Sequence, residues 1–139
     1  MKDIVEPDYI SLTPDTNALE AAKAMKEKHH GFLVVVSQDG KPLGIVTEWD
    51  FLSKIVAQGL DPASVRLQEI MSTNLVSVKS SDGIDSVSKL MADRGIRRVL
   101  VTEDDKIIGV ITSKTILRNL KEYIDDVSTQ IARLQNPPF

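Results

Sequence analysis

The sequence predicts an α/β protein made of two tandem β-α-β-β-α repeats, related by a pseudo-twofold axis and followed by a C-terminal helical extension. A shift of 66 positions aligns 10–12 with 76–78 and 33–35 with 99–101, with the same residue types at matching positions. Gly40 is one extra residue in the first copy, so the offset is 65 at two similar Gly-x-x-Thr motifs, 44–50 and 109–115. Short apolar runs alternate with amphipathic segments in both copies.

Composition limits the class of protein. The chain has 139 residues, 42% of them hydrophobic and 27% charged, as in ordinary globular domains. A net charge of −3 gives no overall basic field that would attract nucleic acid. Cysteine is absent, which excludes disulfides and thiolate metal sites. The longest apolar run, Phe32 to Val36, is too short to cross a membrane, and the N-terminus has no signal-peptide pattern, so we expect a cytoplasmic protein without membrane contact.

Each repeat is expected to begin with a short alternating strand, at 9–13 and 75–79. Polar residues follow at 14–16 and 80–82 and supply candidates for helix N-caps. The next segments have apolar residues at helical spacing, namely Ala18, Ala21, Ala22 and Met25 in the first copy and Ile84, Val87, Leu90 and Met91 in the second.

Two strands joined by a hairpin turn complete each sheet. The buried strands are expected at 32–36 and 99–102, and the turns at Asp39-Gly40 and Asp104-Asp105. The second hairpin strand then enters the glycine-threonine motif and a last helix. The predicted domains are repeat 1 (1–58), a linker (59–66), repeat 2 (67–121) and a C-terminal helix with tail (122–139).

The last helix is expected to continue well past Asn119. Its apolar residues are three and four positions apart, which gives a seam of two to three heptads before Pro137-Pro138: Leu117, Leu120, Ile124, Val127, Ile131 and Leu134. The seam could pack on its own domain or pair with a partner chain. The sequence leaves both open.

The motif at 44–50 has a binding and a structural interpretation. A strand that ends at Thr47 before a helix places Thr47 and Asp50 near unpaired backbone N–H groups, which attract anions. The same residues fit a capping box, in which Asp50 returns to the Thr47 backbone. Trp49, the one tryptophan, is interpreted as an interface residue.

A duplicated β-α-β-β-α unit that ends in this motif resembles the CBS domain pair, also called the Bateman module. The resemblance covers residues 3 to 121 and includes the sequence segments 41–47 and 95–101, which look typical of the family. It implies a regulatory module, generally not an enzyme, that binds AMP, ADP, ATP or S-adenosylmethionine between its repeats and forms a homodimer. Copy two departs from the pattern because Thr115 replaces the terminal aspartate.

The resemblance implies two clefts between the repeats, and the residues at the matching positions of this sequence differ between them. The first combines Gly44, Ile45, Thr47 and Asp50 with Arg97 and Arg98. Carboxylates suit ribose hydroxyls, and guanidinium groups suit phosphate oxygens. The second combines Gly31, Phe32, Thr112 and Thr115, which carry neither a carboxylate nor a basic group. We therefore expect one nucleotide site and one altered site, where His29 and His30 could partly substitute.

The leading functional prediction is a stand-alone tandem CBS sensor of an adenine nucleotide or other adenosyl ligand that modulates a protein partner, which the sequence does not identify. The alternative is a ligand-free scaffold that acts through its dimer surface and C-terminal helix. An enzyme is disfavoured because the sequence has no cysteine nucleophile, no spaced metal-ligand set and no phosphate loop. No cofactor or metal is expected.

Overall fold

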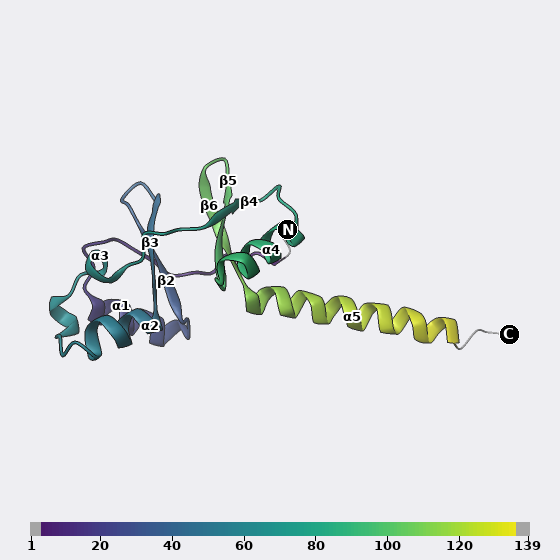
Figure 1. Cartoon of the computed structure of the whole chain (residues 1–139), viewed down its shortest axis with the longest axis horizontal. Helices are drawn as coiled ribbons and strands as arrows, with labels where there is room; N and C mark the ends of the chain where they lie inside the picture. Colours follow the sequence, from purple (N-terminus) through teal and green to yellow (C-terminus); the bar gives the residue numbers. More distant parts are fainter. Residues whose placement is uncertain (1–3, 136–139) are drawn as a thin grey trace.

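The computed structural model describes residues 4–135 and contains two three-stranded sheets (Figure 1). The first repeat consists of β1 (Ser11–Leu12), α1 (Ala18–Lys28), β2 (Phe32–Val36), β3 (Pro42–Thr47) and α2 (Glu48–Phe51), which continues as a π-helix over Leu52–Val56. Within its sheet, β1 runs parallel to β2 and β2 runs antiparallel to β3.

The second repeat has the same order and the same strand directions. It consists of β4 (Ser77–Lys79), α4 (Ile84–Arg94), β5 (Arg98–Glu103), β6 (Lys106–Thr112) and α5 (Ser113–Gln135). The predicted fold class is therefore confirmed. A 3-10 turn (Pro62–Ser64) and the short helix α3 (Leu67–Ile70) lie between the repeats.

Alternating apolar residues give each sheet a buried face. Leu33 and Val35 of β2 face the first core, and Val99 and Val101 of β5 face the second. The opposite faces of the two sheets contribute to a third cluster, built on Val34, Leu100 and Val110. These last side chains are at most 2% exposed. The two sheets thus pack against each other through a shared apolar cluster.

The segment that precedes the first strand of each repeat packs in the core of the other repeat. Ile4, at the start of the chain, lies in the second core, whereas Leu67 and Ile70 of α3 lie in the first. Backbone pairs fix both crossings: Glu6 exchanges two hydrogen bonds with Val110, and Ser72 exchanges two with Ile45. Contacts in space therefore join the two repeats on either side of the segment that connects them.

Glycine is required where these segments cross the sheets. A Cβ on Gly109 would lie 2.6 Å from the backbone oxygen of Glu6 and would also contact Val5. A Cβ on Gly44 would lie 2.7 Å from Sδ of Met71. The group that approaches Gly44 closely is thus Met71, in the segment that crosses the sheet.

The helix caps differ from those expected at 14–16 and 80–82. Asn17 caps α1 by accepting a hydrogen bond from the Glu20 N–H (2.9 Å), and Gly83 occupies the cap position of α4. Asp82 instead accepts from the Lys79 N–H (2.9 Å) and stabilises the preceding turn. The sequence prediction was wrong here because short polar side chains stabilise turns as well as helix ends.

Helix α5 leaves the body of the molecule as a long projecting rod (Figure 1). Its first turn contacts the second core through Ile116, and Thr115 is buried. Beyond Asn119, five of the next fifteen residues are large hydrophobic side chains that are about half exposed or more: Leu120, Tyr123, Ile124, Ile131 and Leu134. In this structure the seam does not pack on its own domain. The proline pair at 137–138 lies outside the described residues.

Candidate functional site

Thr47 and Asp50 form a capping box at the start of α2. The Thr47 N–H donates to Asp50 Oδ2 (2.8 Å), and the Thr47 hydroxyl lies 3.3 Å from the same oxygen. Lys54 Nζ lies 3.0 Å from the other carboxylate oxygen and also donates to the Ile70 carbonyl (2.8 Å). Asp50 is only 8% exposed. Its carboxylate therefore holds the strand-to-helix turn and ties it to α3.

The corresponding turn in the second repeat uses a hydroxyl instead of a carboxylate. The Thr112 N–H donates to Thr115 Oγ1 (2.9 Å), and the Thr115 N–H donates to Thr112 Oγ1 (3.1 Å). Thr115 is as buried as Asp50. The two turns are alike in shape, and the second lacks the negative charge.

Arg97 and Arg98 lie where the chain passes from α4 into β5. Gly95 ends α4 in the left-handed region (φ 62°), and the Arg97 carbonyl accepts from the Ser113 N–H (3.0 Å). Arg98 lies over the Phe32 ring, 5.0 Å from its centroid, and Phe32 stacks on His30. Partial burial lowers the pKa of Arg98, the Arg97 charge lowers that pKa further, and Glu48 opposes the shift.

Two adjoining cavities lie beside this arginine pair. The first has a volume of about 260 Å³ and is lined by Ile45, Thr47, Ser72, Asn74, Leu75, Val76, Ile96, Arg97, Arg98 and Leu100. The second, of about 320 Å³, shares Thr47, Arg97 and Arg98 with it and adds Gly31, Glu48, Trp49 and Leu52. The structure thus brings Ile45, Thr47, Arg97 and Arg98 together across the two repeats. Gly44 and Asp50 are not among the lining residues.

Sequence reasoning missed the contribution of the segment before β4. Ser72, Asn74, Leu75 and Val76 form one wall of the first cavity, because Ser72 pairs with Ile45 at its edge. The repeat alignment relates this placement to the first repeat, because Ser72 matches Glu6 at the offset of 66, but the alignment does not show that Glu6 pairs with Val110. Glu48 was also missed: a Cβ on Gly31 would lie 2.9 Å from its carboxylate oxygen and 3.6 Å from Arg98.

The second predicted cleft is also a cavity, with a volume of about 320 Å³. Its lining includes all four residues expected there: Gly31, Phe32, Thr112 and Thr115. Charged side chains enter it from other positions, namely Glu6, Asp8, Arg97, Arg98, Lys114 and Arg118. The four expected positions lack ionic groups, as the sequence showed, but α5, the N-terminal segment and the arginine pair bring charged side chains into the same cavity.

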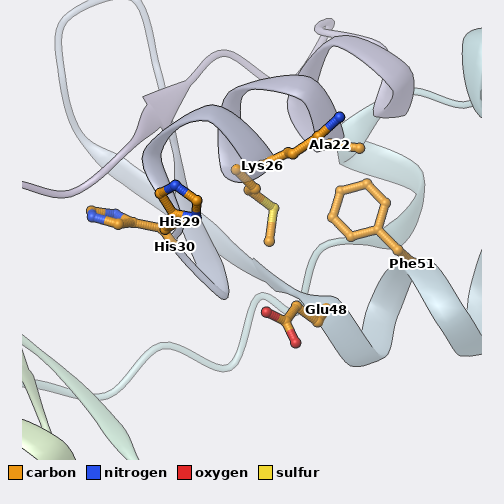
Figure 2. Close-up of a pocket in the computed structure, with 7 residues that line it drawn as sticks. Ala22, Lys26, His29, His30, Glu48 and Phe51 are labelled. Carbon is orange, nitrogen blue, oxygen red and sulfur yellow. The ribbon is translucent and has the colours of Figure 1, made fainter.

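A further cavity of about 530 Å³ lies between α1 and α2, and neither Thr47 nor Arg97 is among its lining residues (Figure 2). Figure 2 shows Lys26, His29 and His30 at the end of α1 across from Glu48 and Phe51. The Nδ1 atom of His30 is buried without a hydrogen-bond partner in this part of the structure. No group of three or more metal-ligating side chains occurs within 4–135.

The cavities beside Arg97 combine three chemical properties. Ile45, Val76 and Ile96 provide apolar contact for a flat ring, and the backbone at the Ile45–Ser72 crossing is close by. Thr47 provides a hydroxyl, and two guanidinium groups provide donors for an anionic group. Apolar walls with a few convergent polar groups are typical of small-molecule sites.

Comparison with known proteins identifies the family. A family model described as "CBS domain" matches residues 1–57 and again residues 67–122. The chain belongs to the CBS domain family. An uncharacterized protein of Methanopyrus kandleri is 32% identical over 134 residues, a match that covers 96% of this chain and 68% of that protein.

Solved structures share the CBS-pair fold. An uncharacterized conserved protein from Pyrococcus horikoshii superposes with a TM-score of 0.78 at 28% identity and covers 85% of this chain and 89% of its own. The CBS domain pair of protein MJ0100, in complex with 5′-methylthioadenosine and S-adenosyl-L-methionine, superposes with a TM-score of 0.76 at 29% identity and covers 88% and 95%.

Some relatives are named as enzymes, but the similarity covers only a part of them. A homoserine O-acetyltransferase of Methanohalobium evestigatum is 32% identical over 124 residues, which span 24% of that enzyme. The matched region is the CBS pair, a module that is generally regulatory and not catalytic. No helix within residues 4–135 combines the length and apolar character needed to cross a bilayer.

Proposed function

We propose that this CBS pair is a regulatory module that binds an adenosyl compound in the cavities beside Thr47, Arg97 and Arg98. The candidate ligands are AMP, ADP, ATP and S-adenosylmethionine. The observation that supports the proposal most is the meeting of Thr47 from one repeat with Arg97 and Arg98 from the other at an apolar cavity. The adenosyl ligands of the MJ0100 pair support the same class of compound.

The ligand's parts fit different walls of this site. The adenine ring would contact Ile45, Val76 and Ile96, and a phosphate would lie at Arg97 and Arg98 in the adjoining cavity. Because Asp50 already binds Thr47 and Lys54, its role in this proposal is to position the Thr47 hydroxyl. This replaces direct ribose contact as the expected role of Asp50.

Binding between the repeats gives a physical route to regulation. A ligand that contacts both repeats changes the balance between conformations only through different affinities for them. The cavity joins β3, β5 and the segment before β4, so occupancy would favour one relative placement of the two sheets. We propose that a cytoplasmic partner protein and the homodimer respond to this placement.

The test is calorimetric titration of AMP, ADP, ATP and S-adenosylmethionine into the wild type, Arg97→Ala and Arg94→Ala. Arg94, exposed in the last turn of α4 and outside the cavities described above, is the matched control. Loss of a charge-assisted hydrogen bond should weaken nucleotide binding about tenfold or more in Arg97→Ala. Arg94→Ala should bind as the wild type does.

The same titration separates two kinds of ligand. S-adenosylmethionine has no phosphate and carries a net positive charge, and its one anionic group is a carboxylate, so Arg97→Ala should weaken its binding less than it weakens the binding of the nucleotides. Equal weakening of all four ligands would contradict a preference of Arg97 for phosphate. Absence of binding by every ligand would contradict the proposed function.

A further inference from the structure

The projecting part of α5 carries an apolar face that nothing in the described structure covers. Leu117 is 64% exposed, Ile124 52% and Leu134 79%. The helix has 23 residues, so it is about 34 Å long at about 1.5 Å per residue. A single helix of this kind is marginal in water without a partner for its apolar face. Figure 1 shows that the body of the same chain lies at one end of α5 and does not flank it.

The apolar residues follow a heptad pattern. Spacings of three and four place Leu117, Ile124 and Ile131 at a positions and Leu120, Val127 and Leu134 at d positions. Isoleucine at a with leucine at d favours two parallel strands in coiled coils. Two of the three a residues are isoleucine and two of the three d residues are leucine.

The flanks of the seam suit pairing between identical helices. Its e and g positions are occupied by Ile116, Lys121, Tyr123, Ser128 and Gln130. In a parallel pair the g residue of one helix faces the following e residue of the other. These pairs are Ile116 with Lys121 and Tyr123 with Ser128, so no like charges face each other. The acidic residues Asp125 and Asp126 lie at b and c, away from the seam.

The buried area would be sufficient for a stable dimer. Six seam side chains that each bury on the order of 100 Å² give roughly 600 Å² per chain. Two chains would then bury roughly 1,200 Å², the lower end of the range for specific protein interfaces. A docking site on an unrelated protein would need a complementary groove, whereas a second copy supplies a matching seam by symmetry.

We propose that α5 pairs with α5 of a second copy of this chain as a parallel, in-register, two-stranded coiled coil. The pairing specifies the interface of the proposed homodimer and does not depend on ligand in either cleft. It places both CBS pairs at the same end of the coiled coil.

The absence of cysteine from the sequence allows a direct test of helix pairing and direction. Leu120→Cys introduces one thiol at a d position, and Glu122→Cys introduces one on the outer face of the same turn. In the full chain under mild oxidation, Leu120→Cys should form a disulfide-linked dimer and Glu122→Cys should not. An antiparallel pair centred on the seam would separate the two Leu120 positions by about 16 Å, too far for a disulfide.

The second measurement is sedimentation equilibrium on Ile124→Glu and on Ala132→Glu, which adds the same charge at an exposed outer position. Ile124→Glu should raise the dimer dissociation constant at least tenfold, and Ala132→Glu should leave it near the wild-type value. Circular dichroism and nucleotide titration of Ile124→Glu report separately on folding and on the ligand site.

Three results would overturn the pairing. They are a wild type that stays monomeric at all concentrations, a dimer whose dissociation constant Ile124→Glu leaves unchanged, and cross-linking of a Leu120→Cys chain to an Ile131→Cys chain in preference to itself. Each of them leaves the ligand-binding proposal intact, because that proposal rests on the cavities.

Discussion

At the scale of single residues, Asp50 does two things in the structure. It accepts the hydrogen bond of the Thr47 N–H and it pairs with Lys54, which itself contacts the Ile70 carbonyl. The sequence motif suggested both a binding role and a capping role, and the geometry establishes the capping role. Local sequence could not decide between them, because both use the same oxygen atoms.

Removing this cap should destabilise the protein. Asp50→Ala should lower the free energy of unfolding by about 1–2 kcal/mol, since it removes the helix cap and the partly exposed ion pair with Lys54. Asp50→Asn keeps an acceptor oxygen for the Thr47 N–H and should lose about half as much. Urea unfolding followed by circular dichroism measures both. Equal stability of Asp50→Ala and the wild type would contradict a structural role for this carboxylate.

Glu48 is expected to oppose anion binding at the arginine pair. Its carboxylate lies next to Gly31 and near Arg98, in a cavity that also contains Arg97. Glu48→Gln removes a negative charge from the wall that a phosphate would approach, so the affinity for AMP should increase about threefold or more. Calorimetry measures this change, and weaker binding by Glu48→Gln would mean that Glu48 contacts the ligand favourably.

At the scale of elements, periodicity predicted most of the strands in both sheets. The strand at 32–36 and the turn at Asp104-Asp105 follow from local residue types, and both turn residues have positive φ, at 52° and 63°. The exchange of Ile4 and Leu67 between the cores could not be derived in this way. It depends on which apolar face a segment meets in space, and periodicity within a segment carries no information about that.

The residues that line the cavities could be predicted from the sequence only in part, for the same reason. Thr47 and Arg97 were found because they lie in repeated motifs, whereas Ser72 and Asn74 lie in an irregular segment whose position is set by the crossing at Ile45. The charges from Lys114 and Arg118 in the second cavity come from the first turns of α5. Helical spacing predicts α5, but not which turn faces the neighbouring repeat.

Replacing the two equivalent glycines at these crossings by alanine should lower the free energy of unfolding by unequal amounts. Gly109→Ala should lower the free energy of unfolding by about 1–3 kcal/mol, because the new methyl group would press on the Glu6 backbone. Gly44→Ala should cost less, because the neighbouring Met71 side chain can move. Chemical denaturation of both variants tests the difference. Equal costs would mean that the N-terminal crossing is not as tight as the structure shows.

At the scale of the whole molecule, Arg97 and Arg98 line cavities on both sides of the repeat interface. The pseudo-twofold axis duplicates the turns but not these charges, since Gly31 and Phe32 occupy the matching positions in the first repeat. One arginine pair therefore lines both the adjoining cavities beside Thr47 and the cavity of the second cleft. An anion bound in one cavity would reduce the positive potential available to the other, which favours one nucleotide per chain.

We propose that an adenosyl ligand occupies the cavity formed by Ile45, Thr47 and Arg97. The most direct measurement is a crystal structure of the full chain grown with AMP. We expect one AMP per chain, with its ring between Ile45 and Ile96 and its phosphate at Arg97 and Arg98. AMP bound solely in the cavity of Thr112 and Arg118, or no AMP at saturating concentration, would contradict it.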